Sequence, residues 1–128
     1  MASELAIEVA RLRGWTEIKP SPTEMGLGGD WFGNRPDGKA WGTRVPDYDT
    51  DRAAALELLE YVLSIEKDGQ YFYVADLEKN TDAWYVELAL DFPSGNKRFG
   101  SVGESVRLTV AIALACRDAL RAVKGETP

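Results

Sequence analysis

The chain of 128 residues contains no histidine and a single cysteine, Cys116. Without histidine the commonest general base and the commonest metal ligand are both missing, so neither a Ser-His-Asp triad nor a Cys-His pair can be built. A single cysteine also excludes an intrachain disulfide and a structural zinc site of the Cys/His kind. Any catalysis would have to use carboxylates, lysine, tyrosine or an oxygen-ligated metal. We therefore expect a protein that is not an enzyme and that holds no cofactor and no metal.

Long apolar runs and excess positive charge are also missing. The longest apolar run, Val110–Cys116, is far shorter than the roughly 20 residues that cross a bilayer. The first residues have neither the basic start nor the apolar stretch of a signal peptide. The formal net charge of −6 opposes general attraction to duplex DNA or to an anionic membrane. We expect a cytoplasmic protein with no DNA and no membrane partner.

The proportions of hydrophobic and charged residues predict a folded protein. Hydrophobic residues make up 45% of the chain and charged residues 28%, a balance that is typical of globular domains. The length fits one domain, residues 1–128. We expect Cys116, which lies inside the apolar run, to be a buried small hydrophobic residue.

Apolar residues recur at helical spacing in three segments, which we expect to be helices: Ser3 to Arg13, residues 51 to 67, and a last helix that begins between Ser105 and Thr109. Glycine stands where each of these helices should end, at Gly14, Gly69 and Gly125. For the second helix we expect Asp49 or Thr50 to accept the first free N–H groups, and Asp51 to complement the helix dipole.

Residues 71–77 and 83–91 are rich in aromatic and β-branched residues and are joined by a polar turn, which predicts an antiparallel hairpin. On the second strand, alternation predicts a packed face with Trp84, Val86, Leu88 and Leu90, and a mostly wet face with Tyr85, Glu87 and Asp91. Residues 98–102 are expected to add a short third strand. The fold class we expect is α+β: a small layered domain whose antiparallel sheet of three to four strands packs with about three helices, the second and the last helix both lying on it.

Residues 15–47 hold half of the glycines and four of the six prolines, so we expect a long loop with at most short strands. Four aromatic residues are spaced along this loop: Trp15, Trp31, Phe32 and Trp41. Of these, Trp31, Phe32 and Trp41 can stack a base, and Arg35, Lys39 and Arg44 lie among them and can meet phosphate. Trp41 and Arg44 are candidates for these roles. The alternative is that the loop aromatics are lids that close an edge of the core.

Three further patterns have ordinary structural explanations. The aspartates of residues 47–51 lack the glycine and glutamate that a calcium loop requires, which indicates helix capping. The segment Gly33–Lys39 has the spacing of a phosphate-binding loop, but Ala40 replaces the serine or threonine that holds magnesium. Glu87 and Asp91 are typical of the polar outer face of a hairpin as much as of an acid-base pair.

Two blocks resemble the small phage and prophage proteins of the phage ABA sandwich domain family. One is Val45-Pro-Asp-Tyr-Asp-Thr-Asp51, followed by Ala53-Ala-Ala-Leu-Glu-Leu-Leu59; the other is Ala115-Cys-Arg-Asp-Ala-Leu-Arg-Ala122. An opening helix that ends at Gly14-Trp15 and a central strand with Trp84 extend the likeness over nearly the whole chain. The anti-Thoeris sponges of phages are similar in layout. They sequester cyclic ADP-ribose isomers or cyclic oligonucleotides made by bacterial immune systems, without destroying them.

The resemblance implies that Arg117 and Arg121 in the last helix meet phosphate, while an aromatic residue, Trp41, Trp84 or Phe99, stacks on the base. Arg117 and Arg121 are four residues apart, which puts both on one helix face. Two guanidinium groups placed in this way match a pyrophosphate. The alternative is a solvated helix face, with Asp118 offsetting the charge. The expected partner is a cyclic nucleotide immune signal, bound by a homo-oligomer in the host cytoplasm. The alternative function is a phage protein-interaction factor that inhibits a host protein through an acidic helix face, with no small-molecule ligand.

Overall fold

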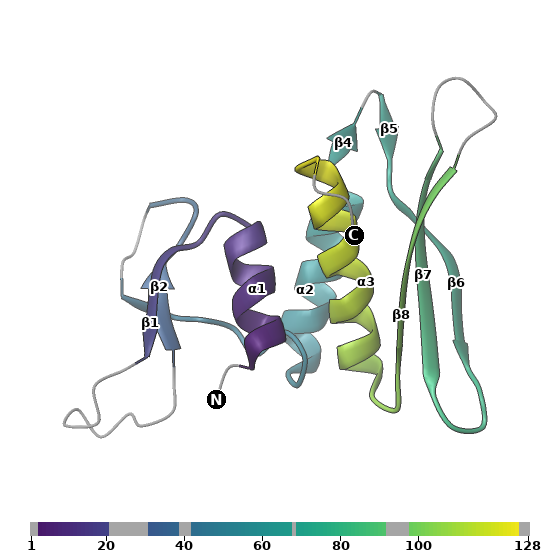
Figure 1. Ribbon diagram of the computed structural model, residues 1–128, viewed down its shortest axis with the longest axis horizontal. Coiled ribbons are helices and arrows are strands. Elements are labelled where there is room, and N and C mark those ends of the chain that lie inside the picture. The colour runs from purple at the N-terminus through teal and green to yellow at the C-terminus, as the bar shows by residue number, and fades with distance from the viewer. Residues whose placement is uncertain (1–2, 21–30, 39–41, 68, 92–97, 126–128) are drawn as a thin grey trace.

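The computed structural model describes residues 3–20, 31–38, 42–67, 69–91 and 98–125, and of Arg98 and Phe99 it describes the backbone alone. The helices are α1 (Glu4–Leu12), α2 (Arg52–Leu63) and α3 (Leu108–Val123). The strands, shown with the helices in Figure 1, are β1 (Thr16–Pro20), β2 (Trp31–Asn34), β3 (Thr43–Arg44), β4 (Glu66–Lys67), β5 (Gln70–Tyr71), β6 (Tyr73–Lys79), β7 (Trp84–Asp91) and β8 (Arg98–Ser105).

The strands form three antiparallel sheets, in the orders β1-β2-β3, β4-β5 and β6-β7-β8. The expected α+β class, with an antiparallel sheet of three strands and three helices, is therefore confirmed for the described residues. The short strands expected within residues 15–47 are β1, β2 and β3. The expected third strand of the hairpin is present as β8, and it runs three residues further than predicted.

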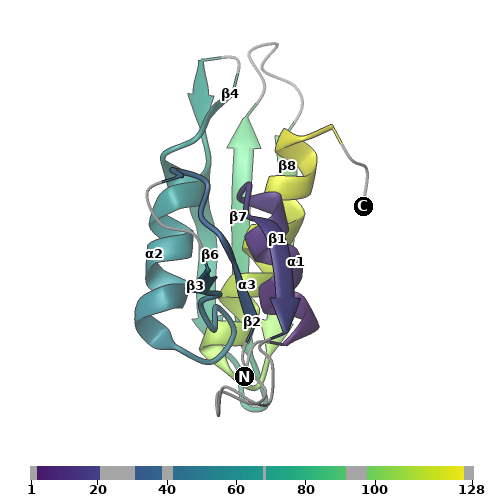
Figure 2. The same cartoon turned by 90° about the vertical axis from the view of Figure 1, so that its left-hand side faces the viewer.

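The helices form a layer between the two larger sheets. Figure 1 shows β1 and β2 on one side of this layer and β6–β8 on the other, and Figure 2 shows the helices running along the β6–β8 strands. Helix α3 lies against β7 and β8, and α1 and α2 pack on α3. The expectation that the second helix also lies on the sheet is wrong, because α3 already occupies the inner surface of β7 and β8.

Local signals set the ends of α1. Ser3 caps the helix by accepting from the backbone N–H of Ala6, and the same hydroxyl donates to Asp49 at 2.5 Å. Gly14 adopts a φ of 101°, which disfavours any residue with a Cβ, and so the chain leaves the helix there as predicted. These contacts bring the end of α1 close to the segment that precedes α2.

Helix α2 differs from its prediction at both ends. Asp51, and neither Asp49 nor Thr50, supplies the cap, by accepting from the N–H of Ala53 at 2.9 Å. The helix ends at Leu63 and not at residue 67: Ser64 is its C-cap, with a hydroxyl that donates to the carbonyl of Tyr61, and the chain then turns into β4. Gly69, expected to end this helix, has a φ of 80° between β4 and β5.

The contact between α3 and the sheet is unusually close at Gly103 in β8. A Cβ at this position would lie 1.9 Å from the carbonyl oxygen of Ala111 in α3. The start of α3 is also held in place, because the Thr109 hydroxyl donates to the carbonyl of Asp49.

Cys116 is fully buried in the helix layer as expected, and burial raises the pKa of its thiol to about 12. None of the helices in the described part of the chain is both long and apolar enough to span a membrane.

Candidate functional site

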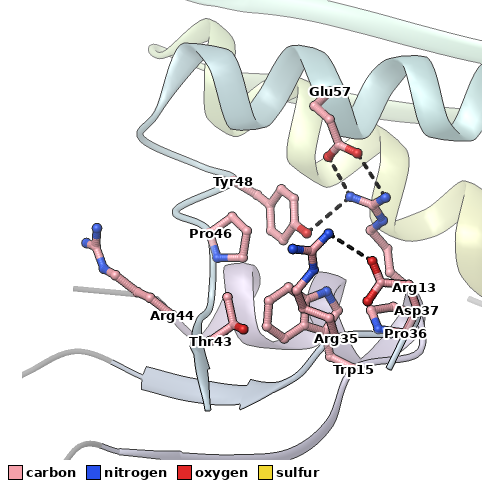
Figure 3. Close-up of a pocket in the computed structure, with 10 residues that line it drawn as sticks. All are labelled: Arg13, Trp15, Arg35, Pro36, Asp37, Thr43, Arg44, Pro46, Tyr48 and Glu57. Carbon is pink, nitrogen blue, oxygen red and sulfur yellow. Dashed lines mark hydrogen bonds and ion pairs between the residues drawn. The ribbon is translucent and has the colours of Figure 1, made fainter. Parts of the chain in front are cut away.

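A pocket of about 490 Å³ opens between the helix layer and the β1–β3 sheet (Figure 3). It is built by the end of α1, the turn after β2, strand β3, the segment that leads into α2, and one residue of α2. The residues that line it are Arg13, Trp15, Arg35, Pro36, Asp37, Thr43, Arg44, Pro46, Tyr48 and Glu57. Three arginines and two aromatic rings from distant parts of the sequence therefore meet in one cavity.

Arg13 is fixed in this pocket by several contacts with its neighbours. Its guanidinium donates to both carboxylate oxygens of Glu57, at 2.6 and 3.0 Å, and to the hydroxyl of Tyr48 at 3.2 Å. The guanidinium carbon also lies 4.2 Å from the centre of the Tyr61 ring, within the range of a cation–π contact. Burial alone would lower the pKa of Arg13. The hydrogen bond to Glu57 and the charges of Tyr48 and Glu57 together outweigh burial, so the pKa is raised. Arg13 is a fixed positive charge that joins α1 to α2.

Arg35 and Arg44 are the more accessible cations of the pocket. Pro36 takes the second position of the turn that carries Arg35, and the N–H of Gly38 closes this turn on the Arg35 carbonyl at 3.1 Å. Arg35 donates from Nη2 to Asp37 at 2.9 Å, with 46% of its side chain exposed. Arg44 donates to Asp47 at 2.9 Å, with 52% exposed. Both guanidinium groups thus have a carboxylate that holds their direction while much of their surface faces water.

Tyr48 and Trp15 are the aromatic residues of the lining. Tyr48 is 1% exposed and Trp15 is 8% exposed, so both rings are set firmly into the core. Burial raises the pKa of Tyr48, and the neighbouring Arg13 only partly opposes this. The Tyr48 hydroxyl therefore keeps its proton at neutral pH. The pocket combines cationic donors with rigid apolar surface, which is the combination that an anionic group attached to a flat ring requires.

The six residues expected to bind ligand do not all meet in this pocket. Arg44 lines it, as does Arg35 from the same loop. Trp41 lies outside the described residues, as does the side chain of Phe99. Trp84 lies on the inner face of the β6–β8 sheet, where the ammonium of Lys79 is 5.6 Å from its ring.

Arg117 and Arg121 do share one face of α3, as their spacing predicts, but that face is turned toward α1. Arg121 contacts the carboxylate of Glu8, and Arg117 lies 3.8 Å from the same carboxylate. Asp118 pairs with both arginines, at 3.1 and 3.7 Å. These side chains are 25% and 30% exposed. In this structure both arginines are therefore paired with carboxylates of α1 and α3.

Eight pocket residues were not singled out as ligand contacts, and four of them shape the site most: Arg13, Trp15, Tyr48 and Glu57. Arg13 is an ordinary cation at a helix end, where the dipole favours it. Tyr48 stands among the capping aspartates. The one usable signal was the density of arginines and aromatic residues in the loop of residues 15–47, and it did indicate Arg35 and Arg44.

Among the residues that the structure describes, no group of three or more cysteine, aspartate or glutamate side chains is placed to hold a metal ion. Comparison of the chain with protein-family models, with curated proteins and with solved structures found no match.

Proposed function

We propose that this protein binds a small phosphate-bearing nucleotide in the pocket between α1, α2 and the β1–β3 sheet, and that it does not cleave it. The observation that carries this proposal is the meeting of Arg13, Arg35 and Arg44 with the rings of Trp15 and Tyr48 around one cavity. Guanidinium groups donate several hydrogen bonds to phosphate, and flat apolar walls favour a base. The sequence resemblance suggests the ligand class, a cyclic nucleotide immune signal made by bacteria, and with it a phage origin.

The arginines differ in how many of their N–H groups are used within the chain, and this difference supports the proposal. Arg35 uses one nitrogen for its hydrogen bond to Asp37, so its remaining N–H groups are available to a phosphate. Arg13 donates from Nη1 and Nη2 to Glu57 and Tyr48, while its buried Nε has no hydrogen-bond partner among the described residues. It contributes fixed positive charge at the base of the pocket. The two carboxylates of the lining accept hydrogen bonds from arginines. That arrangement favours binding over acid-base chemistry, as does the lack of histidine.

A thermal-shift screen tests this function, with ADP-ribose isomers and cyclic di- and trinucleotides as probes. A ligand at about 100 times its Kd stabilises the folded state by about 2.7 kcal/mol, a shift that such a screen resolves. Chromatography of the ligand released by heat should recover it intact. Recovery of a cleaved product would contradict a binding protein, and the absence of a shift with every probe would contradict the proposed ligand class.

Two double variants locate the binding site. The variant Arg35→Gln with Arg44→Gln should abolish the ligand-induced shift, because it removes the accessible donors of the pocket. The variant Arg117→Gln with Arg121→Gln removes the same charge from α3 and should retain the shift. The reverse result would move the site to the α3 face that the sequence resemblance implies.

A further inference from the structure

The outer face of the β6–β8 sheet is not covered by any described element. Figure 1 shows the helices on one side of this sheet only, with β6, β7 and β8 at the margin of the molecule. Strand alternation and the cross-strand register place eleven residues on the uncovered side, which we call the acidic sheet face: Tyr73, Asp76, Glu78, Tyr85, Glu87, Ala89, Asp91, Arg98, Gly100, Val102 and Glu104. Arg98, of which only the backbone is described, lies opposite Asp91 at one end of this face.

Carboxylates are the sole charged side chains described on the acidic sheet face. Asp76 lies directly opposite Glu87, and Tyr85 lies between Glu78 on one neighbouring strand and Glu104 on the other. Like charges placed opposite one another destabilise a sheet, and the wet faces of ordinary sheets mix both signs. The described side chains of this face include five carboxylates and no cation, in a chain whose net charge is −6.

Three of these carboxylates remain available to a partner. Asp91 accepts a hydrogen bond from the Tyr73 hydroxyl at 3.1 Å, and Glu87 has an interaction of its own within the chain. Asp76, Glu78 and Glu104 form no ion pair with any residue that the structure describes. The proposal below rests on these three.

The acidic sheet face also exposes apolar and aromatic surface. Val102 is 43% exposed and Tyr73 is 38% exposed, and Tyr85 is half-buried among the carboxylates. Strand β6 is an edge of the sheet, so none of the described strands lies beside its outer backbone groups. Flat aromatic surface between negative charges is the arrangement on which an arginine side chain can both stack and pair.

We propose that the acidic sheet face is a docking surface for a protein segment rich in arginine and lysine. Negative charge disfavours nucleic acids and anionic membranes, and it favours a cationic partner. A second copy of this chain is a poorer occupant, because the chain is itself acidic, with a net charge of −6, and two copies repel one another. The proposal does not depend on the pocket, since none of its residues lies there.

The test uses the full chain and a fluorescein-labelled octa-arginine peptide, with fluorescence anisotropy at about 150 mM salt, where unpaired surface charges more than about 8 Å apart are largely screened. The wild-type chain should bind this peptide. The triple variant Asp76→Asn, Glu78→Gln, Glu104→Gln should bind it about tenfold more weakly, since each exposed ion pair contributes modestly and three are lost.

A second triple variant is the matched control. Glu4→Gln, Glu60→Gln, Glu66→Gln removes the same charge from exposed positions on α1, α2 and β4, and its affinity should stay within about twofold of wild type. Equal losses in the two triple variants would overturn the proposal, because they would show attraction to net charge alone. Failure of the wild-type chain to bind the peptide would also overturn the proposal. So would self-association of the chain through Asp76, Glu78 and Glu104, measured by analytical ultracentrifugation.

Discussion

The pocket and the acidic sheet face lie on opposite sides of the helix layer, and they arrange charge in opposite ways. In the pocket each arginine contacts a carboxylate: Arg13 with Glu57, Arg35 with Asp37, and Arg44 with Asp47. On the acidic sheet face, carboxylates lie beside other carboxylates. Paired charges hold their side chains in place without a ligand, so the pocket is ready for a small molecule. Repelling carboxylates gain stability only when a cation arrives, which favours a large basic partner.

The two regions also differ in what supports them. The sheet rests on α3 through a backbone contact that leaves no room for a side chain at Gly103. The pocket depends on a polar cluster around Arg13. One region is thus held by close packing and the other by hydrogen bonds and ion pairs, and variants that break each support separately test this difference.

The largest effect is expected from Gly103→Ala. The added methyl group would overlap the Ala111 carbonyl at 1.9 Å and approach the Ala115 nitrogen at 2.8 Å, and both belong to helix backbone that cannot rotate away. The helix and the sheet must separate, with a loss of about 3 kcal/mol or more in the free energy of unfolding. Urea unfolding followed by circular dichroism measures this loss.

Gly100→Ala is the matched control, because Gly100 lies on the same strand but faces outward. Its Cβ would be 3.4 Å from a carboxylate oxygen of Glu87 and 3.9 Å from the Leu88 carbonyl, so it fits with little adjustment. We expect a change below about 0.5 kcal/mol. Similar losses in the two variants would mean that glycine matters for the strand itself and that the packing against α3 is not the cause.

A smaller loss of stability is expected from Arg13→Ala. This change removes two hydrogen bonds to Glu57, one to the buried Tyr48 hydroxyl and the contact with Tyr61, at a cost of about 2 kcal/mol. Arg35→Ala removes an equal charge from an exposed pair and should cost less than about 0.5 kcal/mol. Thermal unfolding of the two variants compares them directly. Equal costs would show that Arg13 does not support the pocket.

The supports of the two regions were not equally predictable from the sequence. Alternation along residues 84–91 gave both faces of β7, including Tyr85, Glu87 and Asp91 on the outer one. Helices α1 and α3 followed from apolar spacing and from glycines at their ends. Local patterns suffice where each residue's role depends on its near neighbours in the chain.

Other features depend on contacts that no local pattern contains. The pocket joins Arg13, Arg35 and Glu57, which are brought together by packing of α1, α2 and a loop. The α3 arginines have the spacing of a phosphate site, but Glu8 of another helix lies against them. Tertiary contacts bring the pocket residues together and place Glu8 beside the α3 arginines.

The smallest effect is expected in the ionisation of two tyrosines, one in each region. Burial raises the pKa of Tyr48, with Arg13 opposing it. For Tyr85, desolvation raises the pKa, and the charges of Glu87, Asp76, Glu78 and Glu104 raise it further. In both cases the folded chain holds the proton more tightly than the unfolded chain does. The stability that this contributes is complete below about pH 10, and it is lost as the pH rises through the folded pKa.

Salt distinguishes the two causes. Added salt screens the carboxylates around the exposed side of Tyr85 and should lower its pKa toward the ordinary value, whereas the buried Tyr48 should respond little. Tyrosinate absorbance during alkaline titration measures both, with Tyr85→Phe assigning the salt-sensitive component. Asp76→Asn with Glu104→Gln should shift that component in the same direction as salt. If salt left the Tyr85 component unchanged, the acidic sheet face would not act on its tyrosine through charge. The contrast with the pocket would then concern burial alone, and the reason to expect a cationic partner would be removed.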